Sequence, residues 1–285
     1  MKNIITLFLT ISFSISLLAN SIPNSEKNIL IKLYQSTNGS QWKVKWDLKA
    51  PVSTWHGIEI QNDHVVGINL SNNNLVGTLP NEITDLKSLV KLNLFKNQIS
   101  GTIPEQIGKL KNLKELNFAF NKLSGAIPNS ICEIPHLNTI MLFMNKLSGE
   151  LPGKMGDLKE LEVVSLFNNQ LSGELPASLY ELKNLKELML SSNNFTGKIS
   201  WNVQNLAALE NLSLFDNKMN GHIPYALAKM DHLKNVNLSY NSFSGVVSEA
   251  LAQKEDFNLT MRNDSGIAFQ LEVSNNANGV FAADE

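Results

Sequence analysis

A strict 24-residue repeat is the feature that most constrains how this chain can fold. With Val65 as position one, position nine is asparagine and position thirteen is glycine in all eight copies, from Gly77 to Gly245. Self-similarity at such a period is the signature of a solenoid, in which neighbouring copies complete one another's core. The asparagines are Asn73, Asn97, Asn121, Asn145, Asn169, Asn193, Asn217 and Asn241.

Each repeat is expected to contribute one short strand. In the second copy, Leu92 and Leu94 alternate with polar residues as in a half-buried strand. The asparagine at position nine follows where the chain turns, and its amide can bond backbone groups of its own bend and of the next repeat. This predicts a buried asparagine ladder. Glycine at position thirteen suits a backbone conformation that a side chain would hinder. Proline fills position sixteen except at Ser200 and Ser248, which predicts a looser convex side there.

Segments such as Asn-Lys-Leu-Ser-Gly-Ala-Ile-Pro128 and Asn-Gln-Leu-Ser-Gly-Glu-Leu-Pro176 resemble the plant-type leucine-rich-repeat family, over residues 65 to about 256. The resemblance implies an α/β solenoid: a curved right-handed superhelix with a parallel sheet on its concave face, as in receptor ectodomains and in inhibitors of secreted polygalacturonases. That family's paired cysteines before the first repeat are absent here, which favours a cysteine-poor, exported relative of bacterial type. Cys132 is the only cysteine, and we expect it to be a buried core thiol.

The sequence predicts four segments. Residues 1–21 are a predicted signal peptide, because a positive start precedes an uncharged apolar stretch too short to span a membrane. Residues 22–64 are predicted to be a helical N-terminal cap, 65–256 the eight repeats, and 257–285 a β-structured C-terminal cap with alternating apolar residues. We therefore expect a secreted, periplasmic or cell-surface protein with no stable membrane insertion after signal cleavage. The tryptophans before the first repeat are interpreted as cap core, with a sugar-stacking platform as the alternative.

The candidate binding surface is the concave face. Positions four, six and nine should point inward, and positions two, three, five, seven and eight should point to solvent. Position seven is phenylalanine in four of the eight copies, which predicts an apolar patch of the kind that marks an interaction site. The alternative is that the rings only stack across strands and stabilise the sheet. The candidate binding residues are Phe95, Phe120, Met141, Phe143, Met144, Phe167, Met189, Phe215 and Tyr240.

Charges of both signs flank this patch, which suits a protein or peptide partner. A glycan ligand, or inhibition of an extracellular glycan hydrolase, is the alternative within the binding class. The formal net charge of −2 and the absence of a basic run argue against nucleic acid.

No catalytic, cofactor or metal set is predicted. The five histidines fall at unrelated repeat positions, and an open solenoid face offers little desolvation to Glu162, Glu187 or Glu210. The sequence therefore favours a non-enzymatic binding module, with a carbohydrate-active enzyme as the alternative from another class.

Overall fold

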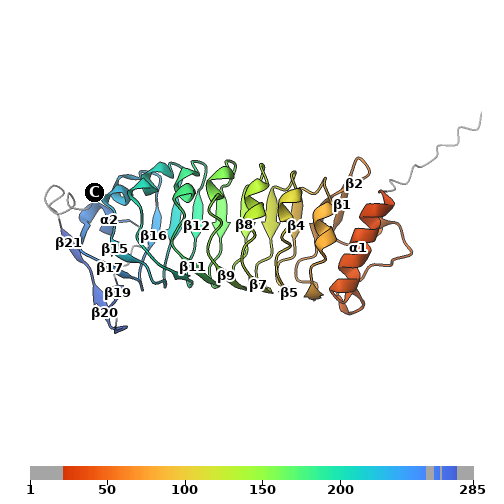
Figure 1. The fold of residues 1–285 in the computed structure, drawn as a ribbon, viewed down its shortest axis with the longest axis horizontal. Helices are drawn as coiled ribbons and strands as arrows, with labels where there is room; N and C mark the ends of the chain where they lie inside the picture. The colour runs from red at the N-terminus through yellow and green to blue at the C-terminus, as the bar shows by residue number, and fades with distance from the viewer. Residues whose placement is uncertain (1–21, 255–259, 264, 275–285) are drawn as a thin grey trace, which may run out of the picture.

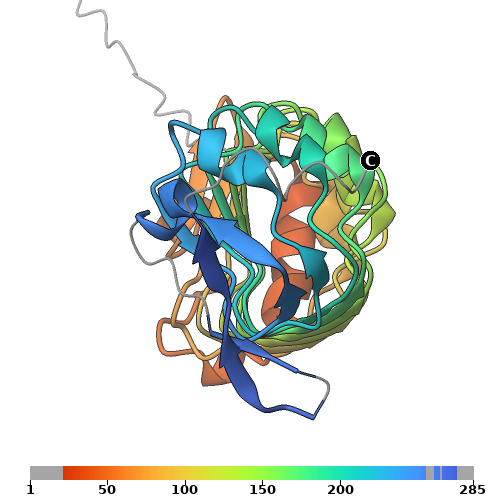
Figure 2. The same ribbon diagram turned by 90° about the vertical axis from the view of Figure 1, so that its left-hand side faces the viewer.

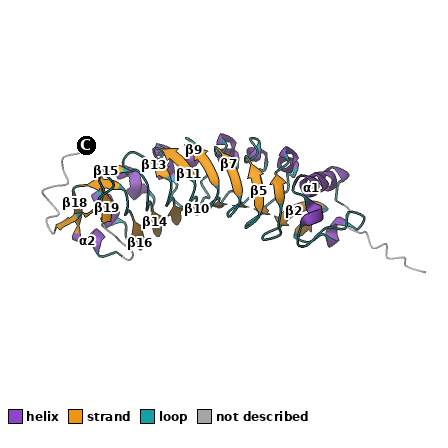
Figure 3. Ribbon diagram, turned by 90° about the horizontal axis from the view of Figure 1, so that it is seen from below, coloured by secondary structure: helices purple, strands orange, loops and turns teal. Residues whose placement is uncertain are grey.

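The computed structural model describes residues 22–254, 260–263 and 265–274. The predicted signal peptide and parts of the predicted C-terminal cap lie outside these residues. The described chain forms a curved solenoid, and a nine-stranded sheet runs along the inner side of its arc (Figures 1 and 3). The predicted fold class is confirmed.

The inner sheet has the order β1-β2-β4-β6-β8-β10-β12-β14-β16. β1 pairs with β2 antiparallel, and every later pair is parallel and offset by one repeat, so that Leu92 lies beside Leu116. Each strand has three to six residues, because the chain bends at both ends of the strand to continue the coil. The strands are β1 Ile58–Gln61, β2 His64–Asn69, β4 Lys91–Asn93, β6 Glu115–Asn117, β8 Thr139–Met141, β10 Val163–Ser165, β12 Glu187–Met189, β14 Asn211–Ser213 and β16 Asn235–Asn237.

A second series of short parallel strands follows the bends and closes each coil of the solenoid (Figure 2). Almost all leucines of the repeats are buried inside the coil. Six strands form one sheet in the order β13-β11-β9-β7-β5-β3, and β15 pairs separately with β17. The strands are β3 Val76–Thr78, β5 Gln98–Gly101, β7 Lys122–Gly125, β9 Lys146–Gly149, β11 Gln170–Gly173, β13 Asn194–Phe195, β15 Asn220–His222 and β17 Ser242–Ser244.

Short 3-10 helices form the outer side of the arc (Figure 3). All of them except η8 follow a proline at position sixteen, whose fixed φ starts the turn, and η8 follows Ser200. The helices in the repeats are η3 Asn81–Asp85, η4 Ile107–Lys109, η5 Asn129–Glu133, η6 Met155–Asp157, η7 Ala177–Glu181, η8 Trp201–Asn205 and η9 Tyr225–Lys229.

The expected loosening at Ser200 and Ser248 is wrong. Both serines have the φ of the prolines they replace, −67° and −69°, against −62° to −73° for the prolines that precede a helix in the other repeats. Their hydroxyls also accept hydrogen bonds from backbone N–H groups of η8 and of α2 (Glu249–Ala252). Because Ser200 has an N–H where proline has none, it also donates to the hydroxyl of buried Tyr180. Serine therefore keeps the bend and adds hydrogen bonds to it.

The asparagines at position nine connect consecutive repeats. The Asn121 amide donates to the carbonyls of Leu94 and Phe118, and its oxygen accepts from the N–H of Ile99, all at 3.0 Å. The other internal copies repeat this pattern. At the N-terminal end Asn73 bonds both backbone groups of Val44 instead, so the cap supplies what a preceding repeat would. Glycine at position thirteen has φ between +75° and +136° in all eight copies, which confirms the conformational reason for glycine there.

The N-terminal cap consists of helix α1 (Asn24–Ser36), helices η1 (Gly39–Gln41) and η2 (Val52–Thr54), and an aromatic core. Trp42, Trp46 and Trp55 are buried, pack ring to ring, and donate their indole N–H groups to backbone carbonyls. Buried indoles cannot stack on a sugar, so the structure supports the cap-core interpretation. Glu26 of α1 is also buried, and it accepts from the N–H of Val65, which fixes the helix to the first repeat.

The C-terminal cap has strand β18 (Val246–Ser248) paired with β21 (Glu272–Ser274), and β19 (Thr260–Arg262) paired antiparallel with β20 (Ala268–Gln270). The apolar alternation predicted there does form strands, but of its four apolar residues only Leu271 is buried, and Ile267, Phe269 and Val273 are exposed. The hairpin β19–β20 extends past the edge of the coil (Figures 1 and 2).

Candidate functional site

Four phenylalanines on the concave face form one packed group, which we call the first aromatic cluster: Phe95, Phe120, Phe143 and Phe167. The rings of Phe143 and Phe167 are stacked, with centroids 4.4 Å apart and an interplanar angle of 12°. Phe120 meets Phe95 and Phe143 edge to face, at 5.4 Å and 5.5 Å. These are favoured geometries for aromatic pairs. The ring stacking that the sequence left open is therefore present.

Ala119 explains why the cluster is continuous across the third repeat. It occupies position seven, where Phe95 and Phe143 stand in the repeats on either side, and it is fully buried. Strands two apart are separated by about 9.6 Å, yet the rings of Phe95 and Phe143 approach to 6.4 Å over the alanine methyl. Phe120, one residue later, then packs beside both rings. The expectation that position seven faces water in every copy is wrong, because Ala119 and Ser239 are buried there.

The apolar patch does not continue to Phe215 as one surface. In the sixth repeat position seven is Ser191, whose hydroxyl lies 2.6 Å from the hydroxyl of Ser213. With no ring at position seven or eight of this repeat, no aromatic residue of the concave face separates Phe167 from Phe215, and the half-buried Met189 adds apolar surface there. The predicted binding residues therefore fall into two groups. Met141 and Met144 lie half-buried with the first, and the sulfur of Met141 accepts from the Asn117 amide.

The second group, which we call the second aromatic cluster, contains Phe215, Tyr240 and Arg262. Phe215 and Tyr240 meet edge to face at 5.2 Å, and the guanidinium of Arg262 in β19 lies 4.4 Å from the centroid of Tyr240. Arg262 also pairs with Asp216 at 3.5 Å. Sequence reasoning missed Arg262, although it is the only arginine of the chain. Its partners lie 22 and 46 residues earlier in the chain, and neither spacing is a multiple of the 24-residue repeat.

Position eight has a left-handed backbone in every repeat, with φ between 52° and 58°. Asparagine and aspartate tolerate this conformation, whereas a bulky residue in it is strained by about 1 kcal/mol or more. The repeat pattern gave no sign of this, because position eight varies from copy to copy. The residues there are Asn72, Lys96, Phe120, Met144, Asn168, Ser192, Asp216 and Tyr240.

Several charged side chains at positions two and three of the concave face form ion pairs between adjacent repeats. Lys91 pairs with Glu115, Lys186 with Glu162, and Lys234 with Glu210, at 2.6 to 2.8 Å. The hydrogen bond from Lys234 lowers the pKa of Glu210. The general acid of a glycosidase needs a raised pKa. The pKa of Glu210 is shifted in the opposite direction, which does not suit that role.

The other titratable candidates are dispersed. His64 pairs with Glu26 near the N-terminal cap, and His136 pairs with Glu160 in an exposed loop. Cys132 is buried, as predicted, and burial raises the pKa of its thiol to about 11, which makes it a poor nucleophile. Among the residues that the structure describes, no three His, Cys, Asp or Glu side chains are placed to hold a metal ion.

Comparison with known proteins identifies the repeats. A family model described as Leucine Rich Repeat matches residues 64–86, 88–110, 112–134, 160–182, 184–206 and 232–253. The chain belongs to the leucine-rich-repeat family. A curated relative, a probable leucine-rich-repeat receptor-like serine/threonine-protein kinase of Arabidopsis thaliana, is 34% identical over 91 residues, which are 31% of this chain and 15% of that protein.

Solved plant receptor ectodomains share the leucine-rich-repeat fold and the plant-type repeat. PEPR1 in complex with AtPEP1 matches 80% of this chain with 29% identity and a TM-score of 0.72. The Arabidopsis receptor kinase HAESA, in complex with the peptide hormone IDA and the co-receptor SERK1, matches 88% with 27% identity and a TM-score of 0.66. The chain spans 36% and 46% of the lengths of these two structures.

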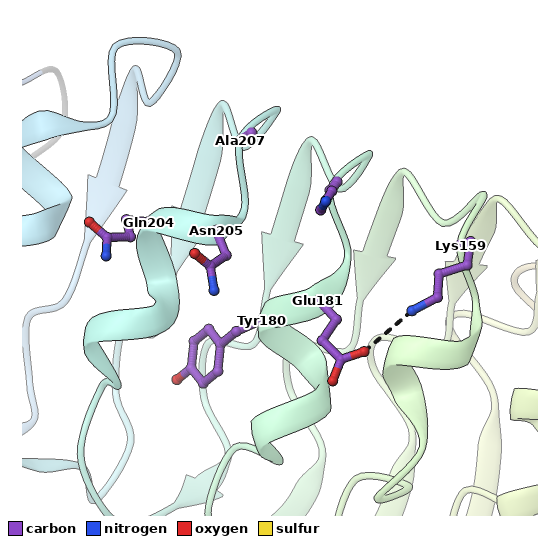
Figure 4. Close-up of a pocket in the computed structure, with 7 residues that line it drawn as sticks. Lys159, Tyr180, Glu181, Gln204, Asn205 and Ala207 are labelled. Atoms are coloured by element: carbon purple, nitrogen blue, oxygen red, sulfur yellow. Dashed lines mark hydrogen bonds and ion pairs between the residues drawn. The ribbon is translucent and has the colours of Figure 1, made fainter.

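The leucine-rich repeats also leave a shallow groove on the outer side, between the fifth and sixth copies (Figure 4). Tyr180 and Glu181 line one wall and Gln204 and Asn205 the other, and Glu181 pairs with Lys159 at 3.3 Å. The Tyr180 hydroxyl is engaged by Ser200. Burial raises the pKa of the Tyr180 hydroxyl, which keeps it protonated and makes it a poor base or nucleophile. The concave face is the better candidate site. No helix of the described ranges is both long and apolar enough to cross a bilayer.

Proposed function

We propose that this leucine-rich-repeat protein is an exported, non-enzymatic binding module that recognises a protein or peptide through its concave face, centred on the first aromatic cluster. The observation that carries the proposal is Phe120. Its ring is 39% exposed on a backbone conformation that disfavours bulky residues. Strain of this kind persists where the surrounding structure holds it and often accompanies function.

Ring stacking alone explains how the phenylalanines are arranged, but not why they are present. The sixth repeat has serine at positions seven and eight, and it keeps the same strand and the same asparagine ladder as the repeats with rings. The sheet therefore forms without rings on its surface. Clustered, partly exposed phenylalanines at the centre of the arc are more economically explained as contacts for a partner, in which aromatic residues are enriched.

The chemistry of the cluster favours a protein or peptide over a glycan. Sugars stack on free aromatic faces beside hydrogen-bonding groups. The facing sides of Phe143 and Phe167 are covered by one another, phenylalanine has no polar atom, and the tryptophans of the cap are buried. Apolar side chains of a partner can pack on such a surface without polar complements. In the similar HAESA structure the ligand is the peptide hormone IDA, and extending that ligand class to this chain is part of the proposal.

Partner capture with matched variants tests the proposal. The protein, the double variant Phe143→Ser/Phe167→Ser and a control Val76→Ser are immobilised and exposed to surface extracts, and retained proteins are identified by mass spectrometry. Val76 is an exposed apolar residue on β3, outside the inner sheet. We expect the protein and the Val76→Ser control to retain the same partner and the double variant to lose it while unfolding at a similar temperature.

Two outcomes would count against the proposal. A partner retained by the folded double variant would place the binding surface elsewhere. Turnover of a glycan by the purified protein, abolished by Glu162→Gln or Glu187→Gln, would make it an enzyme.

A further inference from the structure

The concave face contains the same aromatic arrangement twice. In the third and in the eighth repeat, a small buried residue at position seven is followed by an aromatic residue at position eight. Each of these rings meets the position-seven phenylalanine of the preceding repeat edge to face, at 5.4 Å and 83° in one case and 5.2 Å and 78° in the other. The two sets are Phe95, Ala119 and Phe120, and Phe215, Ser239 and Tyr240.

The copy at the C-terminal end is filled by the chain itself. Arg262 lies over the ring of Tyr240 and pairs with Asp216. A cation above an aromatic face is attracted by the ring, and the carboxylate adds a charge partner. Asp216 occupies position eight of the seventh repeat, 24 residues before Tyr240. The site thus matches its occupant in both shape and charge.

The copy in the third repeat is open, and its charge is reversed. Phe120 is 39% exposed, and no cation–aromatic contact covers it among the described residues. Lys96 precedes Phe120 by 24 residues, so it stands where Asp216 stands in the other copy. An arginine placed over Phe120 would meet the ammonium of Lys96. A carboxylate in the same place would be attracted to it.

Two further lysines stand two residues after position eight, at the first residues of β7 and β9, where the chain has left the inner sheet. Lys122 and Lys146 occupy position ten of the third and fourth repeats, and together with Lys96 we call them the lysine rim. Positions eight and ten of the second to fifth repeats include no carboxylate. In the described ranges none of the three lysines forms an ion pair, and Lys122 donates only to the Gln98 side chain. By contrast, Lys91, Lys186 and Lys234, at position two or three of their repeats, are paired with glutamates.

We propose that the first aromatic cluster and the lysine rim bind an acidic segment of a protein partner, in which an apolar side chain is flanked by carboxylates. The apolar side chain packs against Phe120 and Phe143, and the carboxylates face Lys96, Lys122 and Lys146. This inference rests on the proposed function and names the chemistry of its ligand. The apolar contact supplies most of the affinity, while the lysines select for charge and make binding sensitive to salt.

Selection from a displayed library of random linear peptides tests the charge of the ligand. The protein is compared with Lys96→Glu and with Lys183→Glu, which makes the same change of net charge on the outer side of the solenoid. From the protein and the control we expect peptides in which an aromatic or large aliphatic residue has Asp or Glu within two positions. Lys96→Glu should reduce that acidic enrichment.

Affinities of one enriched peptide then measure the effect. Lys96→Glu should weaken binding about tenfold at low salt, since it removes one attraction and adds one repulsion, and the difference should shrink in 0.5 M salt, where the Debye length is only about 4 Å. Phe120→Asn should weaken binding at both salt concentrations. Lys183→Glu should leave the affinity unchanged. Thermal unfolding of each variant checks that the solenoid is intact.

The outcomes separate this inference from the proposed function. Enrichment of basic or uncharged peptides, or an affinity that Lys96→Glu leaves unchanged, overturns the acidic ligand but not concave-face recognition, provided that Phe143→Ser/Phe167→Ser still abolishes binding. Peptides that bind the double variant as well as the protein overturn both. No enrichment above an uncoated surface also overturns the acidic-segment inference.

Discussion

The interior of this solenoid and its concave surface obey different rules, although alternate residues of the same strands make up both. Position four is aliphatic, position six is leucine or phenylalanine and position nine is asparagine in all eight copies, and all of these residues are buried except the half-buried Asn145. Positions seven and eight carry rings, hydroxyls, amides and both signs of charge. The interior sets the coil because each leucine and each asparagine contacts the next repeat, whereas a surface residue is free to vary unless it meets another ring.

The two regions are nevertheless linked through the backbone. The bend that directs the position-nine asparagine inward forces a left-handed conformation on position eight, whatever residue stands there. Asn72 and Asn168 suit that conformation, and Phe120 and Met144 are strained by it. The interior thus makes bulky surface residues costly at one position of each repeat, and their presence there is more informative than at position seven.

The largest expected effect comes from comparing a core residue with the surface residue that follows it in the chain. Leu166 is buried and Phe167 lies half-buried on the surface. Leu166→Ala should lower the free energy of unfolding by about 2–5 kcal/mol, since it leaves a cavity in the core. Phe167→Ser removes one stacked pair, worth about 0.5–1.5 kcal/mol, and the contacts of a ring that is only half-buried, so it should cost less than Leu166→Ala. Urea denaturation measures both. Equal losses would mean that the rings belong to the core, and the division would fail.

The next test concerns the asparagine ladder, at its middle and at its end. Asn121→Ala should lower the free energy of unfolding by about 2–3 kcal/mol, because the buried N–H of Ile99 loses its acceptor and two carbonyls lose a donor. Asn73→Ala should cost about 1 kcal/mol, because its partner Val44 is 45% exposed and water can replace the amide. If Asn73→Ala lowered the free energy of unfolding as much as Asn121→Ala, the stability that the ladder contributes would not depend on the burial of its hydrogen-bond partners.

The sequence predicted the interior well because the interior is periodic. The parallel sheet, the inward positions, the asparagine ladder and the special glycine all follow from residues that recur every 24 positions. The surface was predicted less well, because its contacts are not periodic. Phe95 and Phe143 lean together over Ala119, and Arg262 reaches Tyr240 from a hairpin after the last repeat. No local pattern encodes such contacts, and strand alternation alone placed Ala119 and Ser239 on the outside.

A smaller effect of the opposite sign tests the strain at position eight. Met144→Asn should raise the free energy of unfolding by about 0.5–1 kcal/mol, because asparagine tolerates the left-handed backbone better than methionine does. Met144→Ala is the matched control. Alanine lacks the local hydrogen bonding that helps asparagine, so it should give no such gain. If both variants are equally stable, backbone strain is not what distinguishes position eight from the rest of the surface.

The smallest effect separates a surface charge from the coil beneath it. The hydrogen bond from Lys234 holds the pKa of Glu210 below its ordinary value of 4.5. A lowered folded-state pKa contributes stability that is present above the unfolded pKa and lost as pH falls through the folded one, so the contribution of the pair declines as the pH falls below that ordinary value. Carboxyl carbon shifts in an NMR titration should show a Glu210 midpoint below 4.5 that rises in Lys234→Gln. Lys186→Gln, which removes a more distant charge, should raise it less, and an unchanged midpoint in Lys234→Gln would show that this exposed pair is already screened by water and salt.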